Sequence, residues 1–378
     1  MASAEPIRVL LVDDSAVVRS VLKKGLSEAS GMEVVGVAHN GRQGLEMVEA
    51  EKPDAVVLDV EMPEMTGIEF LDTLQPAKRD DLVVVMFSSA SKKNAEVTME
   101  CLSRGAQEFI SKPDPARTGM REPLEETVNE LARTVKGLVK AKKGNRPEPS
   151  GAKKASAGGS PPPRSAGSTP KPGSGIPAKF QPDLVLIGSS TGGPQTLHTI
   201  LSGIQDNGAV RTPLLLVQHM ARGFTGPFAD RLGARGPIPW REAEDGEKVP
   251  LGTGLVAPGD YHMRVSRYTN RLTASLDQGE RVNSCRPAVD PLFMSAAELP
   301  GTRVLAIILT GMGQDGMEGA RAIRDAGGVV VVQDEDSSAV WGMPGSVARA
   351  GLHHAIQTPQ EIATLLTRVL YGQAATTG

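Results

Sequence analysis

Three residue types that suit a hydrolytic triad follow apolar runs in the second half of the chain. Leu184–Ile187 leads into Gly188-Ser189-Ser190-Thr191-Gly192-Gly193-Pro194, where the glycines permit a sharp turn from strand to helix. Leu214–Val217 leads to His219, and Val304–Leu309 leads to Asp315. A hydroxyl nucleophile needs a base, and the base needs an orienting carboxylate. These residues predict acyl transfer at a serine of the glycine-rich turn.

Each of these residues also has a simpler interpretation. His219 taken alone fits a histidine satisfied at a strand end, and Asp315 fits a helix cap. His262 is the main competing base among the six histidines. The glycine-rich run lacks both the Gly-x-Gly-x-x-Gly spacing of a dinucleotide site and the lysine of a nucleotide-triphosphate loop. The convergence of complementary types at three strand ends favours catalysis.

A second set of polar residues follows predicted strands in the first half of the chain. It comprises Asp13, Asp14, Asp59, Ser88 and Lys112. The carboxyl ends of parallel strands open onto one edge, so we expect these side chains to meet there. Acidic residues at strand ends can also be plain helix caps, as Ser15 is expected to be.

Three neighbouring carboxylates repel each other unless a cation intervenes, and Mg²⁺ prefers such oxygen ligands. Asp59 is then placed to attack a phosphoryl group. Lys112 can neutralise a phosphoryl oxygen, and the Ser88 hydroxyl can hydrogen-bond another. The set predicts a magnesium-dependent phosphorylation site at Asp59.

The elements that position these residues form two α/β domains. In the first, five short β-branched runs alternate with helical patterns, which predicts a parallel sheet covered on both faces. The predicted strands are Arg8–Val12, Glu33–Val37, Ala55–Leu58, Leu82–Phe87 and Glu108–Ile110. The helix from Pro123 onward has a four-three apolar spacing that fits a short coiled coil, although a fifth helix of this domain is the preferred interpretation.

Strands and helices alternate again from Asp183, with a fourth strand at Val329–Val332 and a helix at Met317–Ala326. We predict two doubly wound parallel-sheet domains, at residues 7–140 and 182–370. The stretch 141–181 is rich in Pro, Gly, Ser and Lys and is predicted to be a disordered linker.

Composition excludes several functions. The formal net charge is -3 and aromatic residues make up 3% of the chain, which argues against a nucleic-acid grip. No apolar run is long enough to cross a bilayer, so no direct membrane insertion is expected. Two cysteines and the absence of a signal-peptide pattern predict a cytoplasmic protein.

The first domain resembles the receiver domain of response regulators. The resemblance rests on Val-Asp-Asp-Ser, Leu-Asp-Val-Glu-Met-Pro-Glu-Met-Thr-Gly, Phe-Ser-Ser-Ala and Ile-Ser-Lys-Pro. It implies a flavodoxin-like fold and phosphorylation of Asp59 by a sensor histidine kinase. It also implies Mg²⁺ held by Asp14 and Asp59, with Asp13 acting through water. Phe109 matches an aromatic switch position, and a plain core role competes with that.

The second domain resembles the chemotaxis protein-glutamate methylesterase family. The shared motifs include Ile-Gly-Ser-Ser-Thr-Gly-Gly-Pro, Val-Gln-His-Met, Ala-Pro-Gly-Asp-Tyr-His-Met, Arg-Pro-Ala-Val-Asp and Leu-Thr-Gly-Met-Gly-Gln-Asp-Gly. The resemblance implies Ser190 as nucleophile, with His219 and Asp315. It places Thr191, Gly192 and Met312 near the oxyanion. Asn283-Ser284-Cys285 departs from the more basic residues of many members.

The expected function is therefore demethylation of glutamate methyl esters on the cytoplasmic domains of methyl-accepting chemoreceptors, with deamidation of glutamines. No cofactor is expected for hydrolysis. We expect the unphosphorylated receiver to cover the Ser190 cleft. An esterase or amidase of the same fold in another two-component pathway is the alternative. DNA output lacks a recognition helix, and a silent binding module does not explain the triad.

Overall fold

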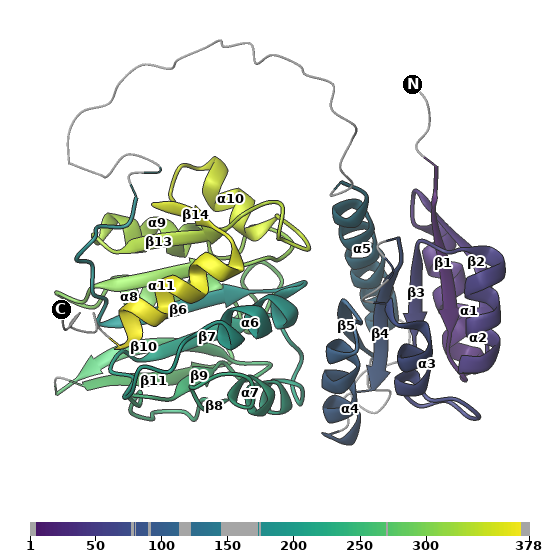
Figure 1. Cartoon of the computed structure of the whole chain (residues 1–378), viewed down its shortest axis with the longest axis horizontal. Coiled ribbons are helices and arrows are strands. Elements are labelled where there is room, and N and C mark those ends of the chain that lie inside the picture. Colours follow the sequence, from purple (N-terminus) through teal and green to yellow (C-terminus); the bar gives the residue numbers. More distant parts are fainter. Residues whose placement is uncertain are drawn as a thin grey trace, which may run out of the picture.

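The structure is a computed structural model that describes residues 5–76, 79, 81–89, 92–112, 122–144, 173, 175–269 and 271–371. Two α/β units lie next to each other, with the amino-terminal unit on the right of Figure 1. Most of the predicted linker lies outside the described residues, so its disorder and the exact domain boundaries stay predictions. None of the described helices has the length and apolar character needed to cross a bilayer.

The amino-terminal unit is built on a five-stranded parallel sheet with strand order β2-β1-β3-β4-β5. Its strands are β1 (Ile7–Val12), β2 (Met32–Ala38), β3 (Ala55–Leu58), β4 (Val83–Ser89) and β5 (Glu108–Lys112). All five predicted strands are present, and most extend one or two residues further than the apolar runs. The doubly wound prediction is confirmed, because the order reverses next to β1.

Helices cover both faces of this sheet. They are α1 (Ala16–Glu28), α2 (Gly41–Glu51), α3 (Gly67–Leu74), α4 (Lys92–Ser103) and α5 (Glu122–Gly144). Ser15 caps α1 as predicted, since its side chain accepts a hydrogen bond from the Val18 N–H. The apolar stripe of α5 is buried against the sheet, which confirms the fifth-helix interpretation over the coiled coil.

The carboxy-terminal unit contains a seven-stranded parallel sheet with order β14-β13-β12-β6-β7-β9-β8. Its strands are β6 (Leu184–Ser189), β7 (Leu214–Gln218), β8 (Trp240–Glu242), β9 (Gly254–Val256), β12 (Val304–Ile308), β13 (Val329–Gln333) and β14 (Ala355–Gln357). The central strands β6, β7, β12 and β13 are those predicted from their apolar runs.

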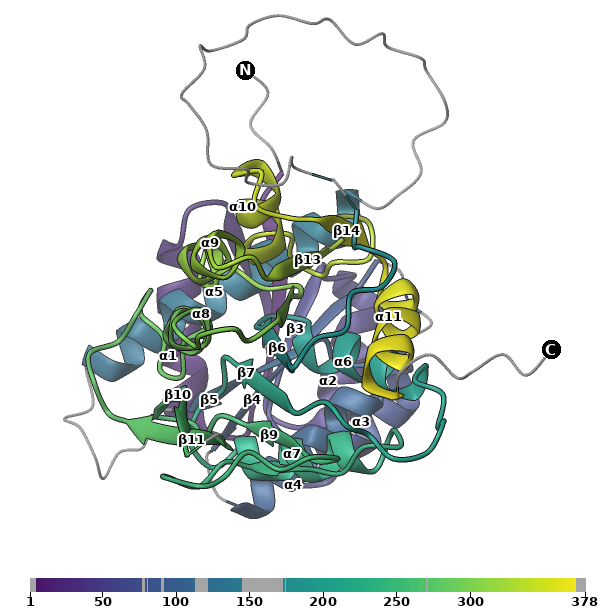
Figure 2. The ribbon, with the colours of Figure 1, turned by 90° about the vertical axis from the view of Figure 1, so that its left-hand side faces the viewer.

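One face of this second sheet carries α6 (Gly193–Ser202), α7 (Thr225–Gly233) and α11 (Pro359–Tyr371). The other face carries α8 (Val289–Ala297), α9 (Met317–Asp325), α10 (Met343–Arg349) and the antiparallel hairpin of β10 (His262–Tyr268) and β11 (Arg271–Asp277). Figure 2 shows these two layers on either side of the sheet. The hairpin was not predicted from the sequence.

Candidate functional site

Ser190 and His219 emerge from neighbouring strands at the same sheet edge. Ser189 and Gln218 are register partners at the ends of β6 and β7. The His219 N–H donates to the Ser189 carbonyl at 3.0 Å, and the Ser190 N–H donates to the Thr310 carbonyl at 3.0 Å. The strand ends therefore place Ser190 beside both the β7 turn and the loop that follows β12.

The two adjacent serines have different surroundings. Ser189 is fully buried, and its hydroxyl donates to the Gln218 side chain at 2.6 Å. Ser190 is partly exposed, and its hydroxyl has no hydrogen bond to another described residue. Of the two hydroxyls, only that of Ser190 is partly exposed and free of a hydrogen bond to the described residues, so the choice of Ser190 as nucleophile stays a prediction.

His219 and Asp315 form a direct pair. The His219 Nε2 atom lies 2.7 Å from the Asp315 carboxylate. A carboxylate can only accept, so Nε2 carries the proton and Nδ1 is the nitrogen left to accept one. No hydrogen bond joins Ser190 to His219 in the described part of the chain, so the structure contains the base–acid half of the predicted triad.

Asp315 is buried at the amino end of α8. The Val289 N–H donates to its carboxylate at 2.6 Å and the Asp290 N–H donates at 3.1 Å. Helix amino termini favour negative charge. Burial opposes the charge, but the hydrogen bonds from His219 and from these amides outweigh it and lower the pKa of Asp315. The carboxylate is thus kept ionised next to the imidazole.

Two residues beside this pair were missed by the sequence analysis. The Asn283 side-chain amide donates to both Asp290 and Asp315 at 3.1 Å. The Cys285 thiol lies 3.5 Å from His219 Nδ1. Both belong to the segment Asn283-Ser284-Cys285. Nothing in their sequence neighbourhood marks them, because a turn with positive φ at Asn283 and Ser284 brings them to the site.

The contacts of His219 control its protonation. Burial lowers the pKa of the imidazole, but the hydrogen bonds to Asp315 and Cys285 outweigh burial and raise it to about 10. In this arrangement the ring favours the imidazolium form. A base must be neutral to accept a proton, so His219 has to lose a proton before it can act as a base in this arrangement.

The competing histidine is accounted for by structure. His262 is buried on β10, where its Nε2 atom lies 2.9 Å from the Glu280 carbonyl and Nδ1 accepts the Ala288 N–H at 3.3 Å. Both ring nitrogens are occupied by the backbone. His262 therefore has no nitrogen available for a substrate.

The predicted oxyanion residues are spread around the start of α6. Thr191 is buried, and its carbonyl accepts the Thr310 hydroxyl at 2.9 Å. Gly192 has a φ of 77°, and a Cβ there would lie 2.4 Å from Ala339, so only glycine fits this turn. Met312 lies with its methyl group beside Gly137 of α5. The oxyanion roles remain predictions.

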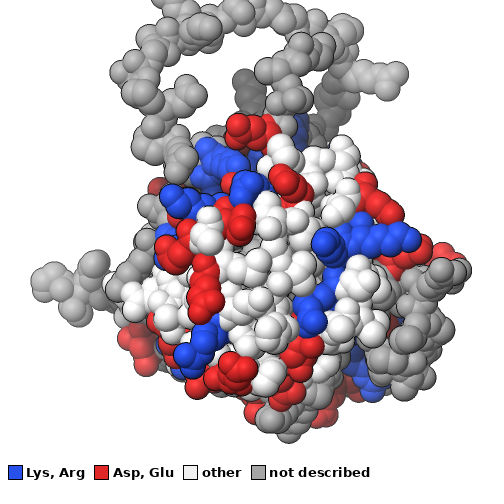
Figure 3. Space-filling model, turned by 90° about the vertical axis from the view of Figure 1, so that its right-hand side faces the viewer, with Lys and Arg blue, Asp and Glu red and all other residues white. Residues whose placement is uncertain are grey.

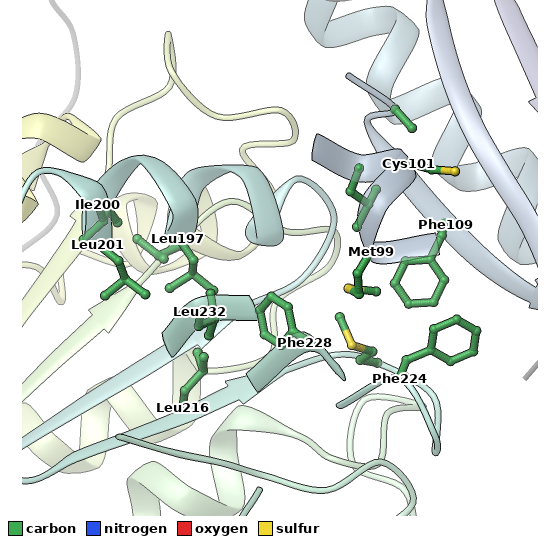
Figure 4. Packing of buried hydrophobic residues seen from close by; sticks show 14 of the residues in the cluster. Met99, Cys101, Phe109, Leu197, Ile200, Leu201, Leu216, Phe224, Phe228 and Leu232 are labelled. Atoms are coloured by element: carbon green, nitrogen blue, oxygen red, sulfur yellow. The ribbon is translucent and has the colours of Figure 1, made fainter. Parts of the chain in front are cut away.

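The amino-terminal unit covers this edge. The Glu108 carboxylate accepts the Gly192 N–H at 3.0 Å, and the Gln195 side chain donates to the Ala106 carbonyl at 2.6 Å. Phe109 stacks on Phe224 with ring centroids 4.4 Å apart (Figure 4). One apolar cluster therefore runs from the first unit into the second, next to the Ser190 turn.

The acidic cluster of the amino-terminal unit is assembled as predicted from the strand ends. Asp13, Asp14 and Asp59 each offer an oxygen, and these oxygens lie within 4.8 Å of one another. The Lys112 ammonium lies 2.8 Å from Asp13 and 2.6 Å from Asp59. Burial raises the pKa of Asp59 to about 6, despite the opposing effect of Lys112. Such a cluster is typical of a Mg²⁺ site.

The two remaining predicted switch residues lie on the adjacent strands. Ser88 is fully buried near the end of β4 and pairs in register with Ser111 of β5. Phe109 is 7% exposed, and its ring faces the second unit instead of solvent. Phe109 therefore has a more specific position, at the contact between the two units, than the plain core role considered from the sequence.

Comparison with known proteins agrees with both halves. Residues 185–366 match the family model "CheB methylesterase" and residues 9–120 match "Response regulator receiver domain". A protein-glutamate methylesterase/protein-glutamine glutaminase from Maricaulis maris is 40% identical over 91% of both chains. One from Nitrobacter hamburgensis is 41% identical over 97% of this chain and 95% of its own. The Thermotoga maritima CheB catalytic domain is 38% identical, covering 50% of this chain and 99% of that one, with a TM-score of 0.48.

Proposed function

The chain belongs to the family of CheB methylesterases with a receiver domain, and we propose on this premise that Ser190, His219 and Asp315 hydrolyse glutamyl methyl esters. The substrates are the glutamates of chemoreceptor cytoplasmic domains, in chemotaxis adaptation. The observation that carries the proposal is the His219–Asp315 hydrogen bond at the sheet edge where the unbonded hydroxyl of Ser190 also lies.

In this mechanism the Ser190 oxygen attacks the γ-carbonyl of the ester. His219 takes the serine proton on Nδ1 and returns it to methanol, while Asp315 fixes the tautomer and stabilises the imidazolium. Water then attacks the acyl-serine with His219 again as base, which releases the glutamate side chain. A glutamine side chain reacts in the same way and releases ammonia.

The start of α6 supports the developing negative charge. A helix amino terminus presents backbone N–H groups that have no partner within the helix. Gly192 and the adjacent turn lie two residues from Ser190, within reach of an oxyanion formed at its acyl carbon. Thr191 and Met312 are assigned to the same region on the family resemblance.

Substitution of Ser190 tests the nucleophile. Ser190→Ala should reduce methanol release from methylated receptor fragments by about 10³-fold or more, because removal of a triad nucleophile eliminates the acyl route. Ser202→Ala is the matched control and should retain activity, because Ser202 is the exposed last residue of α6. Full activity in Ser190→Ala would disprove the assignment.

We propose that a sensor histidine kinase phosphorylates the receiver at Asp59. Asp13, Asp14 and Asp59 fit a divalent cation, because three acidic oxygens converge beside a single ammonium group. When bound, Mg²⁺ would neutralise the charge that builds up between these carboxylates and the phosphoryl group. We expect the Lys112 ammonium to hold one phosphoryl oxygen. We expect the Ser88 hydroxyl to hydrogen-bond another once the end of β4 rearranges.

We further propose that the unphosphorylated receiver masks the site. The contacts through Glu108, Phe109 and α5 place it over the Ser190 edge. Because the two domains belong to one chain, their effective concentration is roughly millimolar, so modest contacts suffice for masking. A chain beginning at Pro182 should therefore be more active than the unphosphorylated whole, and equal activity would argue against masking.

A further inference from the structure

A large basic cavity lies at the edge of the catalytic sheet opposite the Ser190 turn. Asp183, Pro213 and Arg303 line it, and they directly precede or lead into β6, β7 and β12 at their amino ends. Its volume is about 980 Å³. Tyr371, the last residue of α11, also lines it. The cavity is thus separate from the proposed hydrolytic site.

Positive charge dominates the cavity. Its cations are Arg211, Lys248, Arg267, Arg271 and Arg303. Asp183 is the single carboxylate among the described lining residues, and it is already paired with Arg303 at 2.7 Å. Arg211, Lys248 and Arg271 make no side-chain hydrogen bond or ion pair with the described residues. The cavity therefore carries local positive charge although the chain as a whole has a net charge of -3.

Charge is distributed differently on the opposite side of the molecule. On the receiver face shown in Figure 3, Lys and Arg lie interspersed with Asp and Glu around an uncharged centre. Mixed charges of this kind form solvated ion pairs of small net effect. The cavity has no such balance, so its cations are available to an anionic partner.

Apolar groups lie between the cations. Leu251 is 66% exposed at the cavity, and Val249 and Leu272 line it as well. The Tyr371 hydroxyl is buried without a hydrogen-bond partner in the described part of the chain. A buried tyrosine hydroxyl normally has one. A ligand that fits must combine several anionic groups with apolar surface and a hydrogen-bonding atom.

We propose that this cavity binds an acidic peptide segment of a partner protein, with apolar side chains between its carboxylates. The cations come from separate loops and from the β10–β11 hairpin, which suits an extended chain better than one compact anion. Arginine forks match carboxylates in two-point pairs. The chain itself supplies no such segment nearby, since 142–179 contains one acidic residue, Glu148, and 372–378 contains none. The proposal does not depend on the chemistry at Ser190.

Fluorescence anisotropy with the full-length protein and a labelled peptide of alternating glutamate and leucine tests this proposal. Binding should weaken with added salt, because exposed charges are screened. The triple variant Arg211→Glu, Lys248→Glu, Arg271→Glu should lose about tenfold or more in affinity. The matched variant Lys23→Glu, Lys24→Glu, Arg42→Glu carries the same charge change on the receiver and should bind normally.

Equal binding of a glutamine–leucine peptide, or unchanged binding by the triple variant, would overturn the proposal. So would binding of inorganic phosphate or of anionic vesicles in the absence of peptide binding. Thermal unfolding followed by circular dichroism reports whether each variant is folded. If the triple variant is unfolded, the milder pair Arg211→Gln, Lys248→Gln replaces it, with the same expected direction.

Discussion

The carboxylate of Glu108 on the receiver accepts a hydrogen bond from the backbone N–H of Gly192, 3.0 Å away, at the start of the helix that follows Ser190. Hydrolysis of a glutamyl ester produces a glutamate side chain. The receiver thus presents the same chemical group as the expected product to an amide next to the proposed nucleophile. If the receiver masks the site as proposed, this contact is the one that lies directly at the turn of the nucleophile.

Removal of that carboxylate should raise basal activity. A hydrogen bond between neutral groups contributes about 0.5–1.5 kcal/mol, so below pH 7, where Glu108 is protonated in the covered form, Glu108→Ala should shift the covered–open equilibrium about two- to tenfold toward open. The measurement is methanol release without a phosphodonor. Glu33→Gln, an exposed residue on the far strand β2, is the control and should behave as wild type. A Glu108 variant with unchanged basal rate would show that other contacts alone maintain masking.

Masking should also strengthen as pH falls. Burial at the interface raises the pKa of Glu108 from 4.5 to about 7, although hydrogen bonds from Phe109 and Gly192 oppose the rise. The covered form therefore binds the extra proton more readily than the open form between these values. Covering is favoured at low pH and weakens as pH rises toward 7. Interdomain energy transfer across that window should show this trend in wild type and lose it in Glu108→Gln.

Cys285 should tune the acidic limb of the pH–rate profile. Its thiol lies 3.5 Å from the nitrogen of His219 that must accept the serine proton, and this contact is one cause of the raised pKa of His219. Cys285→Ala should lower that pKa. Because the base must be neutral, the rise of kcat/KM should move to lower pH in the phosphorylated protein. An unshifted limb would mean that the thiol leaves His219 on activation.

Much of both folds could be predicted because buried parallel strands have strong sequence signals. The apolar runs at Ala55–Leu58 and Leu214–Val217 mark central strands, and the residues that follow them meet at one edge. The pairing of His219 with Asp315 follows from that geometry. These predictions need only local patterns and the general topology of doubly wound sheets.

The remaining features depend on long-range contacts or short elements. Strands of three residues such as β8 and β14 are too short to show a period. The approach of Cys285 to His219 depends on a turn in which Asn283 and Ser284, neither of them glycine, adopt positive φ. The Glu108–Gly192 contact joins two domains, and no pattern within either one encodes it.

Divalent metal should control phosphorylation of Asp59 through the cluster with Asp13 and Asp14. In the described part of the chain, the Lys112 ammonium pairs with both Asp13 and Asp59, and burial still raises the pKa of Asp59 to about 6. A protonated Asp59 cannot attack phosphorus, and a bound Mg²⁺ favours the ionised carboxylate, so labelling from a small phosphodonor should need more Mg²⁺ as pH falls toward 6. Chelation of Mg²⁺ should abolish labelling at neutral pH, and added Mg²⁺ should restore it.

The Asp14→Asn variant should bind Mg²⁺ much more weakly than wild type in a calorimetric titration. Asp72→Asn, on the exposed side of α3, should bind Mg²⁺ as wild type does. Full labelling of the metal-free protein would contradict the assignment of these carboxylates.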